Sequence, residues 1–318
     1  MATTTSYTSP QKTGANYEDL DNIAYDISPT ETPFVTMADR KKASGVNFEW
    51  ITRALPAASA NGVVESKTAA ESELAAPTRL KNATQIQERT VTLSGTQMAV
   101  DSVDNWGHVD EETARMLAAI KRDIEAACLR MQPVVYGDAA TARQTRSFAH
   151  FIPQANVVGY TVPASETAAV GAFDGAPYTT LTMDIFRELM KKCYDLGARP
   201  KKVFVDSVNK QLVSGFTGRV NEVINGSQKK VTFDVTMVET DFGLLEIVVD
   251  QFFPSGATKS DYTLFVDPEY VSLKWLRPFR KTEMGVTGDK RTWQIIGEWG
   301  MQVDNPSAHG VAGYDAVP

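Results

Sequence analysis

The feature that most constrains this chain is one long amphipathic segment between residues 109 and 131. Mostly apolar side chains recur there at spacings of three and four and line one stripe of a helix: Val109, Thr113, Met116, Leu117, Ile120, Ile124, Cys128 and Met131. Such a helix is about 35 Å long at a rise of about 1.5 Å per residue, well above the usual length. We therefore predict a spine helix in which Ile120 and Ile124 are buried. Lys121 and Arg122 should face outward or toward a neighbouring subunit.

Both ends of this helix carry the expected signals. Acidic residues fill the first turn at Asp110, Glu111 and Glu112, and Arg130 lies in the last turn, as the helix dipole favours. Pro133 follows and cannot continue the helix, so it closes the segment.

Length and composition limit what surrounds the helix. The 318 residues are enough for roughly two domains, and 42% hydrophobic with 22% charged residues is ordinary for a globular protein. No stretch approaches the roughly 20 apolar residues of a membrane span. The first residues have neither the basic start nor the apolar run of a secretory signal. We therefore predict a protein that is made and kept in the cytosol.

Two further counts narrow the function. The two cysteines, Cys128 and Cys193, are predicted to be small buried hydrophobes rather than a disulfide in a reducing compartment. A net charge of −7 disfavours a dedicated nucleic-acid binder, which needs a basic face to neutralise phosphates. The same charge suits a soluble subunit that must avoid indiscriminate association.

Two segments contain too few large apolar residues to fold alone. Residues 1–44 are polar, and Pro29 and Pro33 exclude a helix interior, so we expect an arm that lies along its own domain or a neighbour. Residues 46–53 and 84–100 alternate as strands do, around a middle that is rich in small and acidic residues. This pattern predicts a long protruding hairpin. The alternative is a disordered loop of about 25 residues. In either case we expect the segment to extend outward from the body of the protein.

The remaining elements mix helices with mostly antiparallel strands. A second amphipathic helix is predicted over 181–196, stopped by Gly197, with one apolar face made of Leu181, Ile185, Leu189 and Cys193. A short helix is expected at 207–216. Strands are expected at 202–206, 231–238, 244–249, 262–266, 270–276 and 292–303, and the second and third of these should pair as a hairpin. This order indicates an α+β fold.

No pattern in the sequence indicates catalysis, cofactor binding or metal binding. The three histidines, His108, His150 and His309, have no cysteine or histidine at metal-ligand spacing. There is no Gly-x-Ser-x-Gly elbow to present a nucleophile. Residues 285–290 lack the spacer and the Gly-Lys-Ser/Thr of a phosphate-binding loop. We therefore predict a protein that is not an enzyme, with no catalytic, cofactor-binding or metal-binding residues.

Seven short segments, taken in order, resemble one protein family. They are residues 27–34 (ISPTETPF), 48–50 (FEW), 121–127 (KRDIEAA), 148–152 (FAHFI), 276–279 (LRPF), 287–290 (TGDK) and 298–305 (EWGMQVDN). With their surroundings they run from residue 17 to about residue 312. Each is short, but together they resemble the SU-ten-like major capsid proteins of tailed bacteriophages, which have the Hong Kong 97-type fold.

The resemblance implies a division of the chain into parts. It implies an N-terminal arm (1–44), an extended β-hairpin loop (45–96), a peripheral domain with the spine helix (97–150 and 271–318) and an axial domain (151–270). The C-terminal strands would complete the peripheral domain beside the strand at 86–100.

The resemblance also implies a function. The chain would be the structural subunit of an icosahedral capsid, assembling into hexamers and pentamers that enclose packaged double-stranded DNA. Implied partners are further copies of the chain, a portal, scaffold or decoration proteins, and weak non-specific contact with DNA, but no membrane. The implied location is the virion capsid, after assembly in the cytoplasm of the host bacterium.

Two comparisons within this fold sharpen the expectation. An encapsulin, a bacterial cargo compartment with the same fold, is the alternative, and the arm motif at 27–34 favours the phage. One relative locks its shell with an isopeptide bond from a loop lysine to an asparagine. Lys67 and Lys81 lie in or near the loop here, but nothing marks either as reactive. We therefore expect no crosslink.

Overall fold

The computed structural model describes most of the chain between residues 31 and 313. The described residues are 31–53, 58, 60, 62–68, 76–99, 109–159, 165–167, 181–216, 223–225, 228–230, 237–240, 242–253, 262–286 and 288–313. The predictions for residues 1–30, for His108, for residues 231–236 and for much of the loop after residue 53 therefore lie outside the described part.

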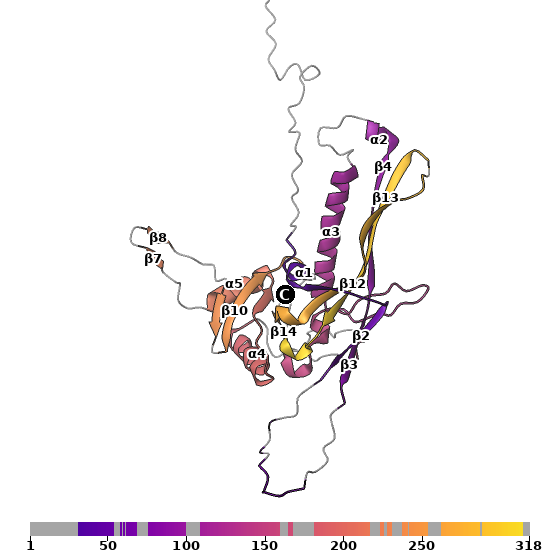
Figure 1. Cartoon of the computed structure of the whole chain (residues 1–318). Coiled ribbons are helices and arrows are strands. Elements are labelled where there is room, and N and C mark those ends of the chain that lie inside the picture. The colour runs from indigo at the N-terminus through magenta and orange to yellow at the C-terminus, as the bar shows by residue number, and fades with distance from the viewer. Residues whose placement is uncertain are drawn as a thin grey trace, which may run out of the picture.

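The long helix predicted from the apolar stripe is present as α3, Val109–Leu129. It lies alongside strand β4, Gln85–Ser94, and contacts strand β13, Lys290–Val303 (Figure 1). Ile120 and Ile124 are buried, and Lys121 between them is exposed. The predicted phase of the helix is therefore confirmed.

Two details of α3 differ from the prediction. The helix ends at Leu129 rather than at residue 131, so Arg130 lies beyond its last turn. The helical pattern stops before Pro133, because the Gln132 N–H donates to the Ser147 hydroxyl at 3.1 Å and the Cys128 carbonyl accepts from the Phe148 N–H at 3.1 Å. Arg122 does not face outward but is half-buried, with its guanidinium 5.4 Å from the centre of the Phe252 ring.

A four-stranded sheet packs beside α3. Its order is β1-β12-β13-β4, with β1 at Asp39–Lys42 and β12 at Val271–Glu283. All of β4 pairs antiparallel with residues 290–299 of β13, so the C-terminal strands do lie beside the strand near residues 86–94. The predicted strand over 84–100 is too long, because residues 95–99 form the short helix α2 (Gly95–Ala99). The Ser94 hydroxyl accepts from the Gln97 N–H at 3.1 Å and starts that helix.

A six-stranded sheet forms the second layer. Its order is β5-β14-β11-β6-β10-β9, with bounds Val157–Val158, Gly310–Gly313, Tyr262–Val266, Lys202–Val205, Gly243–Val249 and Met237–Thr240. Within the described residues, β5 runs parallel to β14, β6 to β10, and β1 to β12 in the other sheet. The other pairings in both sheets are antiparallel, so the predicted mostly antiparallel α+β arrangement is confirmed.

Helices cover both faces of the six-stranded sheet. α4, Met183–Asp195, and α5, Ser207–Phe216, lie on one face, where Leu181, Ile185, Leu189 and Cys193 are buried as predicted. Gly197 takes φ +79° just after α4, the left-handed conformation that ends a helix. α1, Pro33–Met37, and α3 pack on the other face through a second, larger apolar cluster. No described helix is long and apolar enough to cross a membrane.

The protruding hairpin is present, but its second strand was predicted wrongly. β2, Asn47–Thr52, pairs antiparallel with β3, Thr78–Ala83, and not with the strand after residue 84. The chain turns between β3 and β4 at Thr84, whose N–H donates to the Val46 carbonyl at 2.8 Å. The pair β2–β3 extends away from the body of the molecule (Figure 1).

The remaining described elements are short. The predicted hairpin near 231–249 is formed by β9 and β10, and a small antiparallel pair was not predicted. The small pair consists of β7 (Val223–Asn225) and β8 (Gln228–Lys230). Four short 3-10 helices are also described: η2 (Ala149–Phe151), η3 (Gln154–Asn156), η4 (Pro268–Tyr270) and η5 (Pro306–Ala308).

Candidate functional site: an arm anchor and a hairpin base

The described end of the arm is fixed by one aromatic side chain. Phe34, in the five-residue helix α1, is wholly buried. Its ring lies edge-on to Phe148 and to Phe204, each with centroids 5.4 Å apart. Phe204 belongs to the six-stranded sheet, and Phe148 to the loop after α3. Burying such a ring stabilises by about 1.5–3 kcal/mol, so Phe34 fastens the arm between the two sheets.

The spine helix holds the backbone of the same turn. Glu125 of α3 is wholly buried, and its Oε1 and Oε2 accept hydrogen bonds from the N–H groups of Phe34 at 2.6 Å and Val35 at 2.7 Å. These two donors begin a helix and have no partner inside it, so the carboxyl group satisfies them. This role of Glu125 was not predicted from the sequence, because its partners Phe34 and Val35 are about 90 positions away. Its place next to Ile124 on the apolar stripe was the available signal.

A second buried acid lies against Glu125. Asp250 follows β10, and its Oδ1 accepts from the Phe252 N–H at 2.8 Å. Burial, and then hydrogen bonding and repulsion from Asp250, raise the pKa of Glu125 to about 9. The Asp250 Oδ2 is buried and has no hydrogen-bond partner in the described part of the chain. This raised pKa favours the protonated form of Glu125 at neutral pH.

The base of the hairpin is bound to the C-terminal strand. The Trp50 indole N–H donates to the Val303 carbonyl at 3.0 Å, and the Asn82 side-chain amide donates to the Met301 carbonyl at 2.6 Å. The Phe48 ring packs over Gly300 so closely that a Cβ there would lie 2.7 Å from the ring. Only glycine leaves this space, so position 300 is set by the hairpin it supports.

A buried carboxylate joins the hairpin base to the four-stranded sheet. Glu298 of β13 accepts from the Thr84 hydroxyl at 2.6 Å, from Arg143 at 2.9 Å and from Arg277 at 3.0 Å. Two guanidinium groups compensate the one buried negative charge. Thr84 is the turn between β3 and β4, so this network fixes the direction in which the hairpin leaves the body.

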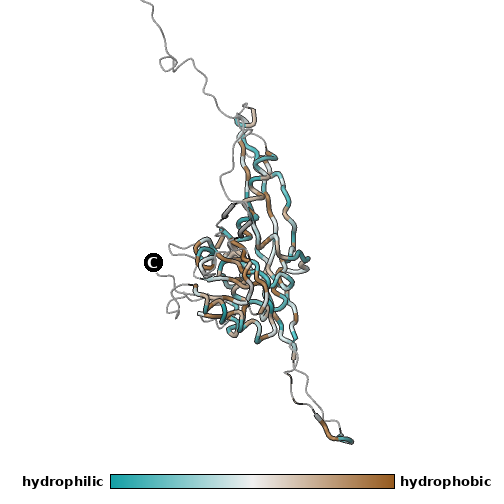
Figure 2. Tube along the Cα trace, turned by 90° about the vertical axis from the view of Figure 1, so that its left-hand side faces the viewer, coloured by the Kyte–Doolittle hydropathy of each residue, from teal (hydrophilic) through white to brown (hydrophobic). Residues whose placement is uncertain are grey.

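The far end of the hairpin is different in character. Val63 and Val64 expose 65% and 76% of their surface, with no cover from the described part of their own chain. Figure 2 shows this apolar stretch at the end of a thin extension, well away from the apolar body. A fixed base and an uncovered apolar end are the arrangement of a contact made with another molecule.

Comparison with known proteins decides what kind of molecule this is. The model of the SU10 major capsid protein family matches residues 2–314. The chain belongs to that family. The major capsid protein of Escherichia phage Phieco32 is 25% identical over 335 residues, 90% of this chain and 90% of that protein. The resemblance found in the sequence is confirmed, and the chain is a structural subunit of a phage capsid, located in the virion shell.

Solved structures agree on the fold of this SU10-family subunit. The capsid of cyanophage P-SCSP1u is 13% identical, with 96% of this chain and 94% of that chain covered and a TM-score of 0.60. The SrpI encapsulin of Synechococcus elongatus PCC 7942 is 9% identical, with coverages of 97% and 95% and a TM-score of 0.57. At these identities the likeness concerns the fold alone. The family match favours the phage capsid over the encapsulin.

The histidines that were weighed as ligands have structural surroundings in the SU10-family subunit. His309 is buried beside Phe148, its Nδ1 accepts from the Asp267 N–H at 3.1 Å, and burial lowers its pKa to about 3. The Nδ1 of His150, also buried, accepts from Arg146 Nε at 2.9 Å. Among the described residues, no three His, Cys, Asp or Glu side chains are grouped to hold a metal ion.

The other singled-out residues are also placed. Cys128 and Cys193 are buried free thiols, as predicted, and burial raises the pKa of Cys193 to about 12. The ammonium group of Lys81 forms an ion pair with the Glu166 carboxylate at 2.8 Å. Lys67 is exposed near the end of the hairpin loop.

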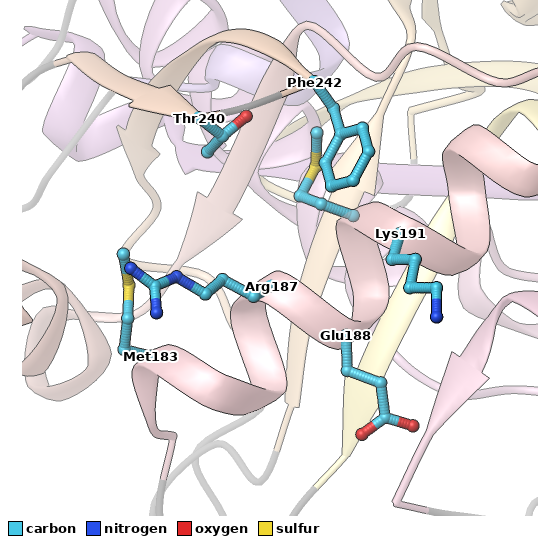
Figure 3. Close-up of a pocket in the computed structure, with 7 residues that line it drawn as sticks. Met183, Arg187, Glu188, Lys191, Thr240 and Phe242 are labelled. Carbon is cyan, nitrogen blue, oxygen red and sulfur yellow. The ribbon is translucent and has the colours of Figure 1, made fainter.

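One cleft lies on α4, beside the turn between β9 and β10. It measures about 340 Å³ and is lined by Met183, Arg187, Glu188, Met190, Lys191, Thr240 and Phe242 (Figure 3). Glu188 is paired with Lys192 at 3.2 Å, and Arg187 and Lys191 extend along the helix without meeting at one point. A catalytic pocket needs converging polar groups, and this cleft lacks them.

The hairpin base gives a first stability prediction. Trp50→Phe removes the indole N–H that binds the Val303 carbonyl while keeping an aromatic ring in β2. We expect a loss of about 1 kcal/mol in the free energy of unfolding, the value of one hydrogen bond, measured by denaturant titration. Ile51→Ala is the matched control, because the neighbouring Ile51 is 60% exposed and should change stability little. Equal losses in the two variants would contradict the anchoring role of Trp50.

Proposed function

We propose that this capsid subunit works in four parts. They are an arm (1–44), an extended hairpin loop (45–96), a peripheral domain (97–150 and 271–318) with α3 as its spine, and an axial domain (151–270). The packing of α3 along β4 and β13 supports the peripheral domain. The six-stranded sheet with α4 and α5 supports the axial domain, and β14 joins that sheet from the C-terminal part.

In this proposal the subunits form hexamers and pentamers that close into an icosahedral shell of the Hong Kong 97 type around double-stranded DNA. The observation that carries it is the hairpin β2–β3, because its base is fixed to β13 while Val63 and Val64 are uncovered. An apolar end carried on an anchored base can be covered by a neighbouring copy. Repeated head-to-tail contacts between copies form a closed assembly when the rotation from one subunit to the next closes on itself. Interfaces of this multi-part kind typically bury roughly 2,000 Å² or more of surface.

Family membership supports the finer partners of the shell. We propose contacts with a portal, with scaffold or decoration proteins, and weak non-specific contact with packaged DNA, for which a net charge of −7 leaves no strong attraction. Assembly would take place in the cytoplasm of the host bacterium, without a membrane partner. The role is structural, with no catalytic residues, cofactor or metal.

Assembly of the purified protein tests this proposal. We expect sedimentation at high concentration to give capsomers or species of megadalton mass, and electron microscopy to show rings or closed shells. The physical reason is that the arm and the loop contain few large apolar residues of their own, so contact with a neighbouring copy is needed to cover them. A 34.8 kDa monomer at every concentration and salt would contradict the proposal. Closed particles filled with a host protein cargo would instead favour the encapsulin.

A further inference from the structure

The cleft on α4, beside the turn between β9 and β10, can hold a few apolar side chains. It measures about 340 Å³, near the lower limit of about 300–1,000 Å³ for ligand pockets. Met183, Met190 and Phe242 give it an apolar lining (Figure 3). The Phe242 ring packs against Tyr194 of α4 with centroids 4.9 Å apart, which fixes one wall of the cleft. A cleft of this size fits the end of a loop rather than the face of a domain.

Positive charge flanks this apolar lining. Arg187 and Lys191 line the cleft, lie about one helical turn apart on α4 and are exposed. Neither forms an ion pair with another residue that the structure describes, whereas the nearby Glu188 is paired with Lys192 at 3.2 Å. An apolar cleft beside two cations is complementary to a segment in which apolar side chains adjoin a carboxylate.

The end of the hairpin, residues 63–67, has this combination of groups. Val63 and Val64 are exposed, and the exposed Glu65 follows them directly. The Lys67 N–H donates to the Val64 carbonyl at 3.3 Å and Ser66 takes φ +67°, so the chain turns here. The turn therefore holds two valines and a carboxylate at the end of the extension (Figure 2).

The hairpin is long enough to bring its end onto another molecule. In their own chain Val63 and Val64 are not among the residues that line the α4 cleft, and both remain exposed. About twelve residues lead from Thr52, the last paired residue of β2, to Val64. A chain of that length spans up to about 40 Å, which exceeds the roughly 32 Å length of α3. The hairpin end can therefore lie on a neighbouring copy.

We propose that residues 63–67 of one copy bind in the α4 cleft of a second copy. The two valines would contact the apolar lining, and Glu65 would pair with one of the two cations beside it. Lys67 carries the opposite charge, and Asp184 in the first turn of α4 is an exposed acid that can pair with it. The inference rests on the proposed assembly and adds to it the surface that receives the hairpin.

Crosslinking between two different copies tests this contact. A Val64→Cys variant is mixed with a Lys191→Cys variant during assembly and treated with a short bismaleimide. The native Cys128 and Cys193 are buried and stay out of the reaction. We expect a product of twice the 34.8 kDa chain mass from the mixture and none from either variant alone.

The rival binding site is the exposed end of the β12–β13 hairpin. Met284 and Val286 expose 45% and 67% of their surface there. A Val286→Cys variant takes the place of Lys191→Cys in a parallel mixture and should give no crosslink to Val64→Cys. A crosslink to Val286→Cys and not to Lys191→Cys would overturn the proposal and assign the hairpin end to that site.

Charge reversal gives a second, independent test. Glu65→Lys places a cation against the two cations of the cleft, so we expect the yield of shells to fall at least several-fold. Adding Lys191→Glu should restore the yield. Adding Lys121→Glu, which changes an exposed lysine of α3, should not restore it, although the net charge is the same. Equal recovery from both additions, or no loss from Glu65→Lys alone, would contradict the contact.

Failure of this contact and failure of the assembly proposal give different results. Closed shells without the crosslink would refute the contact and leave the shell function intact. A protein that forms no shells would fail the assembly proposal. The crosslink would then be sought in the concentrated protein, where its absence would refute the contact as well.

Discussion

A subunit in which residues 53–77 are replaced by Asn-Gly is expected to fold normally and to lose the ability to close a shell. Thr52 and Thr78 are paired in the hairpin, so a two-residue turn can join them without changing the register of β2 and β3. The base contacts of Trp50 and Asn82 remain. The large apolar side chains between residues 55 and 78 are only Leu55, Val63, Val64 and Leu74.

The energetics support this separation of folding from assembly. Ordering each loop residue costs about 1–2 kcal/mol, while burial returns about 25 cal/mol per Å² of apolar surface. Four apolar side chains in 24 positions cannot offset that cost in the isolated subunit. Removing the segment should therefore leave the circular dichroism spectrum and the thermal midpoint nearly unchanged.

Electron microscopy supplies the assembly readout. We expect the shortened subunit to give no closed shells under conditions in which the unchanged protein forms them. A full-length variant with Val63→Ser and Val64→Ser is the matched control for the apolar end, and it should weaken closure as well. Stable shells from the shortened subunit would show that the hairpin loop is not the clasp. The arm at residues 1–44 would then take that role.

Ile124→Asp is expected to destabilise the subunit by about 4 kcal/mol or more, the second large effect. The side chain is 1% exposed and belongs to the apolar cluster between α3 and the sheets. An aspartate there would leave a charge without a partner and remove a well-packed side chain.

Lys121→Ala supplies the matched control on the same helix. Lys121 is exposed, and such substitutions usually change stability by less than about 0.5 kcal/mol. Thermal unfolding of the two variants should therefore differ by many degrees. Similar midpoints for both would contradict the packing described for α3.

Local patterns predicted the helices well. The spacing of Ile120, Ile124 and Cys128 gave both the existence and the phase of α3, because a helix face repeats every 3.6 residues whatever lies opposite. Gly197 marked the end of α4 because its positive φ is a local property. The resemblance of seven short segments gave the family, which no periodicity can supply.

Contacts between distant residues were the part that local patterns could not predict. The strand partner of β2 is β3, because the chain turns at Thr84. The Thr84 hydroxyl donates a hydrogen bond to Glu298, a residue 214 positions away. The parallel pairing of β6 with β10 likewise depends on neighbours that no local pattern contains. The burial of Glu125 was not predicted, because its partners Phe34 and Asp250 lie about 90 and 125 positions away. Burial of an acid is decided by such long-range contacts.

The late position of β13 and β14 in the chain has a consequence for how subunits are made. β13 lies between β12 and β4, and β14 lies between β5 and β11, so residues 290–313 fill interior places in both sheets. A ribosome delivers these residues after all the other strands, and until then neither sheet can close. A prematurely terminated product that stops before residue 290 leaves β4 without its neighbour. Such a fragment lacks an interior strand of each sheet, so we expect that it cannot fold into a subunit able to join a growing particle.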